Sequence, residues 1–346
     1  MRLLFVGPLF DGSTALQRAE AFKAIEGIEV FTLDSMYNLG KGSLTDRVRH
    51  RLRWPADRHN INRNLVAAAN ELRPEVIFID SVRVVTPVTL KALRQSCAAS
   101  LVFYSCDDIT ARHNSSRQLE ACDPEWDIFF TTKSFNVPEL KARGVRRPVL
   151  VGNSFDPKVH RAWTPEEIGD EFERFDAVFV GICENARRQS LNRLAEAGTS
   201  VVVYGDGWIP AKLHPQVTLR PSVYGQGYSR ALHTGKLALC FLRKLNRDLV
   251  TTRSIELPGA ARPMIAEKTW EHDELFDDGV DYISFSNDTE LTERVGALLA
   301  DEDARKALAQ AGRERCIRSG YSTIDRASEM IRVIQTNVLE HRTSLA

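Results

Sequence analysis

Short apolar runs recur along this chain, and amphipathic segments separate them. In the first half the runs are continuous in Val, Ile, Leu and Phe, and they occupy 3–7, 28–33, 75–80, 100–105, 127–132 and 148–152. Strands with this composition are buried on both faces, as in parallel sheets. Segments such as 61–72, which stops before Pro74, have the helical pattern. Alternating strands and helices predict a doubly wound α/β fold.

The alternation stops once and then resumes. Residues 153–176 are polar and contain two prolines, which predicts a linker or a lone helix between two domains. Residues 290–339 are helical in pattern, so we expect C-terminal helices that pack across both domains. We predict two Rossmann-like domains facing a central cleft, with an N-terminal domain over 1–155, a nucleotide-binding domain over 156–322 and a returning helix over 323–346. The resumed apolar runs are 177–181, 200–205, 217–219, 236–241, 263–267 and 281–286.

Charge and hydropathy exclude several classes of protein. The 346 residues carry a formal net charge of zero, which argues against bulk nucleic-acid binding. The apolar and charged contents, 43% and 27%, are those of a soluble globular protein. No apolar stretch approaches the roughly 18 residues of a membrane span. The opening MRLLFVGPLF runs straight into a turn, so we interpret it as a first strand and not as a signal peptide.

The six cysteines are scattered, and none forms a Cys-x-x-Cys pair. This pattern favours reduced, mostly buried thiols over disulfides or a zinc site. We therefore expect a cytoplasmic protein.

The loop GPLFDGST (7–14) comes close to a phosphate-binding loop. The lysine of that motif is absent, because Ser13 stands in its place, and Asp11 would put a negative charge in a phosphate cradle. A nucleoside triphosphatase is therefore disfavoured. Two interpretations stay open: a plain turn, or a ligand-binding loop at the carboxyl end of the first strand.

Other catalytic motifs are missing from the sequence. No strand is followed by Gly-x-Gly-x-x-Gly, no Gly-x-Ser-x-Gly elbow occurs, and no histidines or cysteines have zinc-ligand spacing. The pair Asp107–Asp108 is not flanked like the metal-binding Asp-x-Asp of sugar transferases. With these classes excluded, a nucleotide-type ligand between the two domains is the default hypothesis.

The second half of the chain carries a family resemblance. In order, it has GICENARRQSLNRLAEAG, VYGDGW, YGQGYSRAL, KLALCF, NRDLVTTRSIELPGAARPMIAE, FDDGVDYISFSNDTELTERVGALL and DARKALAQAGRERCIRSGYSTIDRA. From about 177 to 326 this order resembles the donor-binding half of glycosyltransferases with the GT-B fold (glycosyltransferase group 1 type), particularly the CgeB-like branch. The first half matches in architecture only.

The block around Glu256 implies a donor site. Retaining relatives carry two glutamates separated by seven residues, and here Asp248 takes the first position, one methylene shorter. A helix beginning near Thr251, capped by Thr251 or Thr252, would direct its amides at a diphosphate. On this interpretation Arg253 offsets phosphate charge and Glu256 accepts bonds from ribose hydroxyls. The alternative is a buried Arg253–Glu256 ion pair.

Two departures from the family pattern occur in the same block. The family usually has glycine at the position of Ala261 and often at that of Thr251. The small residues 258–261 are expected to let the helix pack closely on the strand that follows.

Further donor contacts follow from the resemblance. An arginine after the first strand of this domain contacts the leaving diphosphate, which implicates Arg187 or Arg188. The alternative is an exposed helix arginine. Arg220, Val223 and Tyr224 stand in the loop that meets the base, where Tyr224 would stack.

Five residues of the first half are expected near carboxyl ends of strands and are candidates for the acceptor side or for catalysis: Asp11, Ser13, Asp107, Asp108 and His113. Each is also a plausible cap or loop residue. An inverting enzyme would need one of Asp11, Asp107 or His113 as its base.

The resulting expectation is a metal-independent, retaining glycosyltransferase without a cofactor, acting in polysaccharide biosynthesis on a UDP- or GDP-linked sugar. Its acceptor is left open between a glycan, a lipid-linked glycan, a small molecule and a protein. A sugar-nucleotide epimerase and a non-catalytic nucleotide-sugar-binding protein are the alternatives. The arginine-rich stretch 45–63 fits a solvated helix face, or a patch for an anionic acceptor or a peripheral membrane contact. The oligomeric state stays open.

Overall fold

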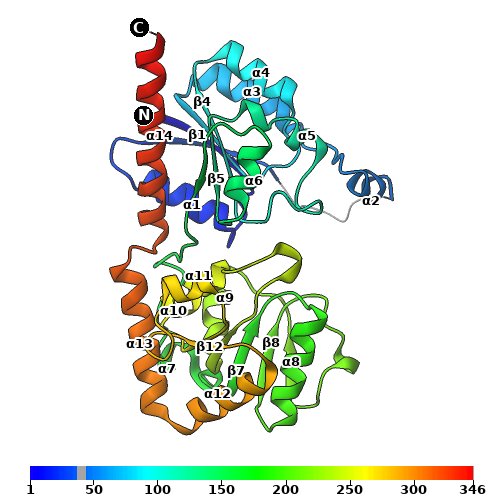
Figure 1. Ribbon diagram of the computed structural model, residues 1–346, viewed down its shortest axis with the longest axis vertical. Coiled ribbons are helices and arrows are strands. Elements are labelled where there is room, and N and C mark those ends of the chain that lie inside the picture. The colour runs from blue at the N-terminus through cyan, green and yellow to red at the C-terminus, as the bar shows by residue number, and fades with distance from the viewer. Residues whose placement is uncertain (37–43, 346) are drawn as a thin grey trace. The chain divides into compact units, whose positions relative to one another are not determined.

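The chain forms two compact α/β units in the computed structural model, which describes residues 1–36 and 44–345 (Figure 1). Unit 1 comprises Met1–Gly152 and Thr323–Ala346, and unit 2 comprises Asn153–Ser322. Each unit contains one six-stranded sheet in which every named strand pair is parallel. The predicted α/β class is therefore confirmed.

The sheet of unit 1 has the strand order β2-β1-β3-β4-β5-β6. Its central strands consist mainly of Leu, Val, Ile and Phe, and their polar residues lie at or near the strand ends, which is why their apolar runs were visible in the sequence. All six strands lie within about two residues of their predicted positions: β1 Arg2–Gly7, β2 Glu29–Asp34, β3 Val76–Asp80, β4 Ser100–Ser105, β5 Ile128–Thr131 and β6 Pro148–Leu150.

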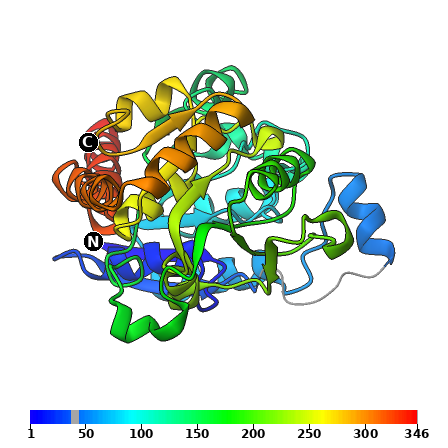
Figure 2. The ribbon, with the colours of Figure 1, turned by 90° about the horizontal axis from the view of Figure 1, so that it is seen from below.

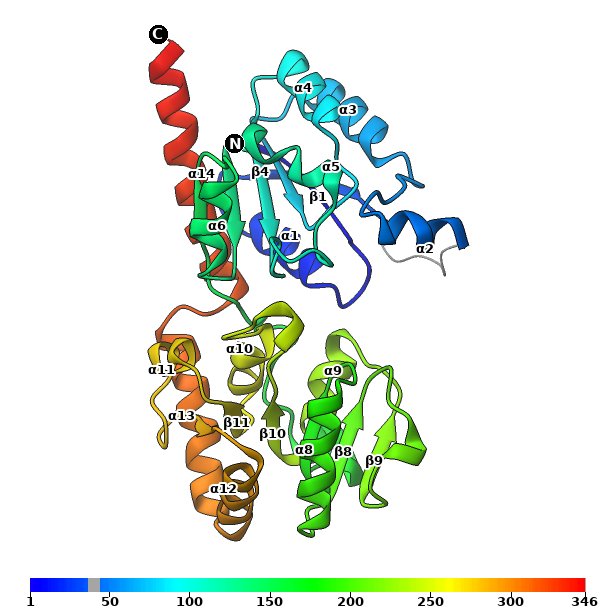
Figure 3. The ribbon, with the colours of Figure 1, turned by 45° about the vertical axis from the view of Figure 1, so that its right-hand side comes forward.

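Alternate side chains of these strands enter two separate cores, because successive strand residues point to opposite faces. Leu4 and Val6 of β1 pack with α3 (Ile61–Leu72) and α4 (Pro87–Ser96), whereas Leu3 and Phe5 pack with α1 (Thr14–Lys23) and α14 (Thr323–Leu345). Figure 3 shows α3 and α4 side by side. The remaining helices of unit 1 are α2 Leu44–Arg51, α5 Arg117–Glu120, η1 Asp123–Glu125 and α6 Asn136–Ala142.

The sheet of unit 2 has the order β12-β11-β10-β7-β8-β9. The strand order reverses between β7 and β10, so the connections that leave these two neighbouring strands run to opposite sides. Open α/β sheets bind ligands at such a point. The strands are β7 Phe175–Val180, β8 Val201–Tyr204, β9 Val217–Arg220, β10 Gly235–Cys240, β11 Met264–Glu267 and β12 Ile283–Phe285.

Helices cover both faces of this second sheet. One face packs on α8 (Asn185–Glu196), α12 (Asp288–Ala300) and part of α13 (Glu302–Arg318), and the other packs on α9 (Gly225–Leu232) and α10 (Thr252–Gly259). Figure 2 shows α12 and α13 next to one another, in orange. The short helices are α7 Pro165–Ile168, η2 Gly169–Glu171, η3 Pro210–Lys212, η4 Lys244–Asn246 and α11 Trp270–Leu275.

The segment 153–176 is not a free linker, which corrects the sequence interpretation. Phe155 is 2% exposed and pairs by a β-bridge with Ser322. A Cβ atom on Gly259 would lie 2.6 Å from the Phe155 ring, so the glycine permits this contact. The small residues at the end of α10 therefore admit Phe155 as well as the neighbouring strand.

All six cysteines are free, as predicted, and Cys122, Cys240 and Cys316 are buried. Among the described residues, no helix combines the length and apolar character that crossing a membrane requires.

Candidate functional site

The start of α10 is fixed by a capping box in which Thr251 is the capping residue. The Thr251 hydroxyl accepts a hydrogen bond from the amide of Arg253 at 3.1 Å, and the Thr251 amide donates to Ser254 Oγ at 3.1 Å. The cap uses the Arg253 amide, and the Ser254 amide donates to the Thr251 carbonyl oxygen at 3.0 Å, so it is the helix dipole that favours an anion at this end of α10. Of the two threonines considered from the sequence, Thr251 is the cap and Thr252 is the first helical residue.

A buried histidine holds Ser254 in this position. His272 Nε2 lies 2.7 Å from Ser254 Oγ, and His272 Nδ1 lies 2.9 Å from the carbonyl oxygen of Glu267. A carbonyl only accepts, so Nδ1 carries the proton and Nε2 accepts from the serine. Burial lowers the pKa of His272 to about 4, which keeps the ring neutral. The sequence interpretation did not include this pair.

Arg253 crosses the end of β7. Its Nε donates to the carbonyl oxygen of Val180 at 2.7 Å, and its guanidinium lies 5.6 Å from the ring centroid of Phe179. A Cβ atom on Gly181 would lie 2.9 Å from Arg253 Nη2. A glycine at the end of β7 therefore allows the arginine to lie against the backbone.

Arg187 brings a second guanidinium to the same ring. It lies 5.5 Å from the Phe179 centroid and is only 4% exposed, and its Nη1 donates to the carbonyl oxygen of Ile182 at 3.1 Å. Burial and then the charge of Arg253 lower the pKa of Arg187. Positive charge at a helix N-terminus favours an anion, so this part of unit 2 is a candidate anion site.

Glu256 is buried, with 7% exposure, and forms no ion pair with Arg253. Glu256 Oε2 accepts a hydrogen bond from the hydroxyl of Tyr228 at 2.9 Å, and Oε1 lies 3.5 Å from His160 Nε2. The alternative of a buried Arg253–Glu256 pair is therefore wrong for this structure. Burial, followed by the charge of Glu256, raises the pKa of Tyr228, so this phenol stays protonated and donates.

Asp248 closes its own loop. Its Oδ2 accepts from the amide of Arg243 at 3.2 Å, and its Oδ1 accepts from the side chain of Asn246 at 2.9 Å. The side chain is half-buried. A role at the sugar stays a prediction, and the carboxylate has a structural role beside it.

The other candidates of unit 2 differ in position. Arg188 is half-buried and donates to Asn185 Oδ1 at 2.5 Å, whereas the neighbouring Arg187 is buried. Arg220 forms an ion pair with Glu171 at 2.6 Å. In the following loop the half-buried Val223 packs on the core, while the side chain of Tyr224 is 62% exposed.

In unit 1, two candidates have structural roles. Ser13 caps α1: its hydroxyl accepts from the amide of Leu16 at 3.1 Å and donates to the carbonyl oxygen of Pro8 at 2.6 Å. Asp108 is fully buried and accepts from the side chain of Asn136 at 2.9 Å. Direct contact of Asp108 with an acceptor would require this turn to open.

The remaining candidates of unit 1 are Asp11, Asp107 and His113. Asp11 is exposed in the turn after β1, and Asp107 is half-buried after β4, with its backbone bound to Ser105. His113 is exposed and lines a pocket with several arginines. The sequence interpretation placed 45–63 as a basic stretch but did not connect it with His113.

Ala261 explains one departure from the family pattern. It follows α10 with a φ of 55°, in the left-handed region where helices commonly place glycine after their last turn. The amide of Arg262 then donates to the carbonyl oxygen of Leu257 at 3.0 Å, which closes the helix.

An Ala261→Gly variant is expected to raise the free energy of unfolding by about 0.5 to 1 kcal/mol, because relief of the left-handed strain exceeds the entropy that glycine adds to the unfolded chain. Urea denaturation measures this change. Ala260→Gly is the matched control: Ala260 has a φ of −84° and is fully buried, so the same change there should destabilise the protein. Equal losses in both variants would contradict a strained Ala261.

Comparison with known proteins bears on this site. Residues 186–332 match the model of a family described as glycosyl transferase-like, and no curated protein matches the chain. HepE from Anabaena, solved with UDP and glucose, has a TM-score of 0.67 at 14% identity over 97% of this chain and 100% of its own. Sucrose-phosphate synthase from Thermosynechococcus elongatus has a TM-score of 0.64 at 13% identity, with 97% and 98% covered. UDP-GlcNAc 2-epimerase from Neisseria meningitidis, bound to UDP-GlcNAc, has 0.55 at 10%, with 97% and 100% covered.

These likenesses show that the chain has the GT-B fold, as predicted. The family match contains the block from Asp248 to Glu256 and both arginines at Phe179. It confirms the predicted resemblance to glycosyltransferases and supports an enzyme of this kind. The CgeB-like subtype stays a prediction.

Proposed function

We propose that this protein transfers a sugar from a UDP-linked donor to an acceptor hydroxyl, with retention at the anomeric carbon and without a metal or other cofactor. One observation carries the proposal: Arg187 and Arg253 meet on the ring of Phe179, beside the first turn of α10. Two permanent cations beside a helix N-terminus support a diphosphate site at this position.

The residue roles follow from that placement. Arg187 and Arg253 bind the diphosphate and stabilise the charge that develops on it. Glu256 accepts ribose hydroxyl hydrogens with the capacity that Tyr228 and His160 leave, since a carboxylate has about four acceptor positions. Asp248 contacts the sugar. UDP is favoured over GDP because HepE and the epimerase were solved with uridine nucleotides.

The chemistry balances without an added reagent. The bond between the anomeric carbon and the phosphate oxygen breaks, and a bond from the acceptor oxygen to the same carbon forms on the same face. The acceptor proton passes to the departing diphosphate oxygen. The six free cysteines agree with the proposed cytoplasmic location, and a role in polysaccharide biosynthesis belongs to the same proposal.

Glu256→Gln is expected to weaken UDP binding by about 1 to 3 kcal/mol, because hydrogen bonds to a charged acceptor are lost. Glutamine keeps the size of the side chain and an acceptor for Tyr228, so the core should stay folded. Calorimetry with UDP and GDP measures the change. Tyr228→Phe is the control, since it removes the neighbouring hydroxyl but leaves the carboxylate. Unchanged affinity for both nucleotides in Glu256→Gln would refute the ribose role.

An epimerase is the second candidate, because His160 lies 3.5 Å from Glu256 and epimerisation requires groups that move a proton at the sugar. Incubation with UDP-GlcNAc in the absence of an acceptor separates the two functions. A transferase releases UDP slowly by transfer to water, whereas an epimerised donor would overturn the transferase proposal. Nucleotide binding without any turnover would indicate a non-catalytic protein.

A further inference from the structure

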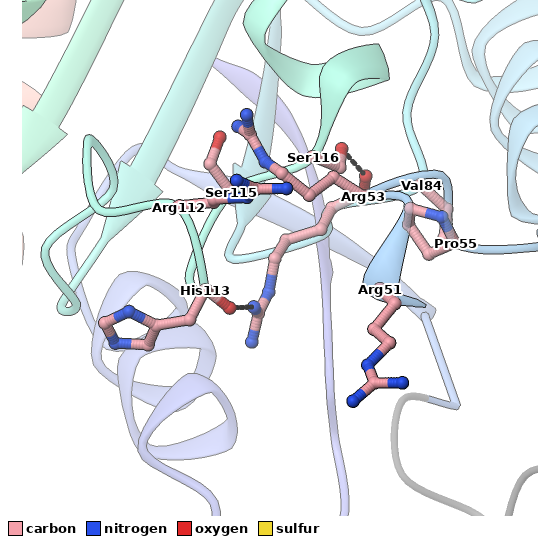
Figure 4. Close-up of a pocket in the computed structure, with 9 residues that line it drawn as sticks. Arg51, Arg53, Pro55, Val84, Arg112, His113, Ser115 and Ser116 are labelled. Atoms are coloured by element: carbon pink, nitrogen blue, oxygen red, sulfur yellow. Dashed lines mark hydrogen bonds between the residues drawn. The ribbon is translucent and has the colours of Figure 1, made fainter. Parts of the chain in front are cut away.

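Unit 1 contains a pocket that the proposed donor site does not use. Its volume is about 350 Å³, and it is lined by the end of α2 with the residues after it, by the loop after β3 and by the loop after β4 (Figure 4). Loops that follow parallel strands lie at the edge of the sheet where α/β proteins bind ligands. The residues that matter here are Arg51, Arg53, Arg83, Arg112, His113 and Ser115.

The pocket is strongly cationic. Four arginines line it, and no carboxylate is among its described lining residues. Arg53 is paired with Glu120, and Arg83 donates to the carbonyl oxygen of His113 at 3.1 Å. Arg51 and Arg112 are exposed, and neither forms an ion pair with any residue that the structure describes. Two guanidinium charges are therefore available to a ligand.

Ser115 gives an independent indication of a ligand. Its side chain is only 6% exposed, yet its hydroxyl has no hydrogen-bond partner within the described part of the chain. Arg53 Nε is also buried and has no hydrogen-bond partner among the described residues. Buried donors are nearly always satisfied in folded proteins, so this wall of the pocket lacks an acceptor that a bound oxyanion would supply.

We infer that this pocket binds a phosphate monoester carried by the acceptor of the reaction. A guanidinium binds two phosphate oxygens at once. The two uncompensated guanidinium charges balance the two negative charges of a phosphate monoester, whereas a carboxylate would neutralise only one of them. The volume is at the lower end for small-molecule sites, which suits a phosphorylated monosaccharide. That the ligand is an acceptor rests on the proposed transferase function, but binding of the phosphate does not.

The inference also gives the basic stretch 45–63 a more specific role. Arg51, Arg53 and Pro55 from this stretch line the pocket, while Arg63 lies exposed on α3 and does not. An anionic acceptor is thereby favoured over a uniformly solvated helix face for the residues 51–55. Asp46, Arg47 and His50 lie in the same stretch, but their side chains are outside the described residues.

The test uses the full chain and calorimetry with inorganic phosphate, glucose 6-phosphate, glucuronate and glucose. We expect the two phosphates to bind and the affinity to fall with added salt. The double variant Arg51→Gln/Arg112→Gln should bind them at least about tenfold more weakly, and Ser115→Ala severalfold more weakly without loss of thermal stability. Arg63→Gln is the matched control, because it removes one exposed positive charge outside the pocket, and it should bind as the parent does.

Four results would overturn the inference. These are unchanged phosphate binding in the double variant, no phosphate binding in the parent, glucuronate binding as tight as glucose 6-phosphate, and binding only to vesicles that contain phosphatidylglycerol. UDP is titrated separately into each variant and should bind with unchanged affinity. If the parent does not bind UDP, the proposed function is contradicted. The conclusion about phosphate binding does not depend on that result.

Discussion

Arg253→Gln is expected to bind UDP about ten- to a hundredfold more weakly than the parent, with little change for uridine. The physical reason is that charge-assisted hydrogen bonds to a phosphate contribute about 1.5 to 3 kcal/mol, and uridine has no phosphate to lose them. Arg253 lies against Gly181, and its guanidinium lies 5.6 Å from the Phe179 ring centroid. The guanidinium of Arg187 approaches the same centroid to 5.5 Å, so the substitution removes one of two cations from this site. Calorimetry with the two ligands measures the difference.

Arg188→Gln is the matched control for this experiment. Arg188 is adjacent to Arg187 in sequence, but it is only half-buried and its guanidinium donates to Asn185. Its loss should leave the affinity for UDP unchanged, whereas Arg187→Gln should behave as Arg253→Gln does. Equal losses for UDP and uridine in Arg253→Gln would mean that the substitution disturbs the fold and not the diphosphate site.

The strands were predictable because their signal is local. A strand in the middle of a parallel sheet is apolar on both faces, and runs such as 75–80 and 200–205 reproduce β3 and β8 within a residue or so. The start of α10 was predictable for a similar reason, since a threonine before an apolar segment marks a helix cap. These features depend on neighbours in the sequence and need no tertiary contact.

The site partners were harder to predict, because they depend on contacts between distant segments. His160 lies 96 positions before Glu256 in a polar stretch that looked like a linker, yet it packs beside that carboxylate. The arginine pocket combines three loops, and only the first carries a run of basic residues. Arg187 and Arg188 are indistinguishable by sequence, because only the rotation of α8 decides which one is buried.

Acidification is expected to destabilise the parent by about 3 kcal/mol through His272 alone. The pKa of this ring is lowered to about 4 by burial, against an ordinary value near 6.5 in the unfolded chain. The unfolded chain therefore binds the proton more readily, so this contribution to stability is complete above about pH 6.5 and is lost as the pH falls toward 4. Urea denaturation at a series of pH values measures it.

The comparison that isolates His272 is His272→Gln, which cannot take up the proton. The comparison is needed because other buried groups titrate in the same range: burial lowers the pKa of His233 to about 3 and raises that of Asp123 to about 6. The variant should be less stable at pH 7, where the bond to Ser254 is lost, but its stability should decline less between pH 6.5 and 4. The affinity of the parent for UDP should fall over the same pH range. A protonated His272 can no longer accept a hydrogen bond from Ser254, and Ser254 orients Thr251 at the start of α10. Parallel decline in parent and variant would show that His272 does not link protonation to the anion site.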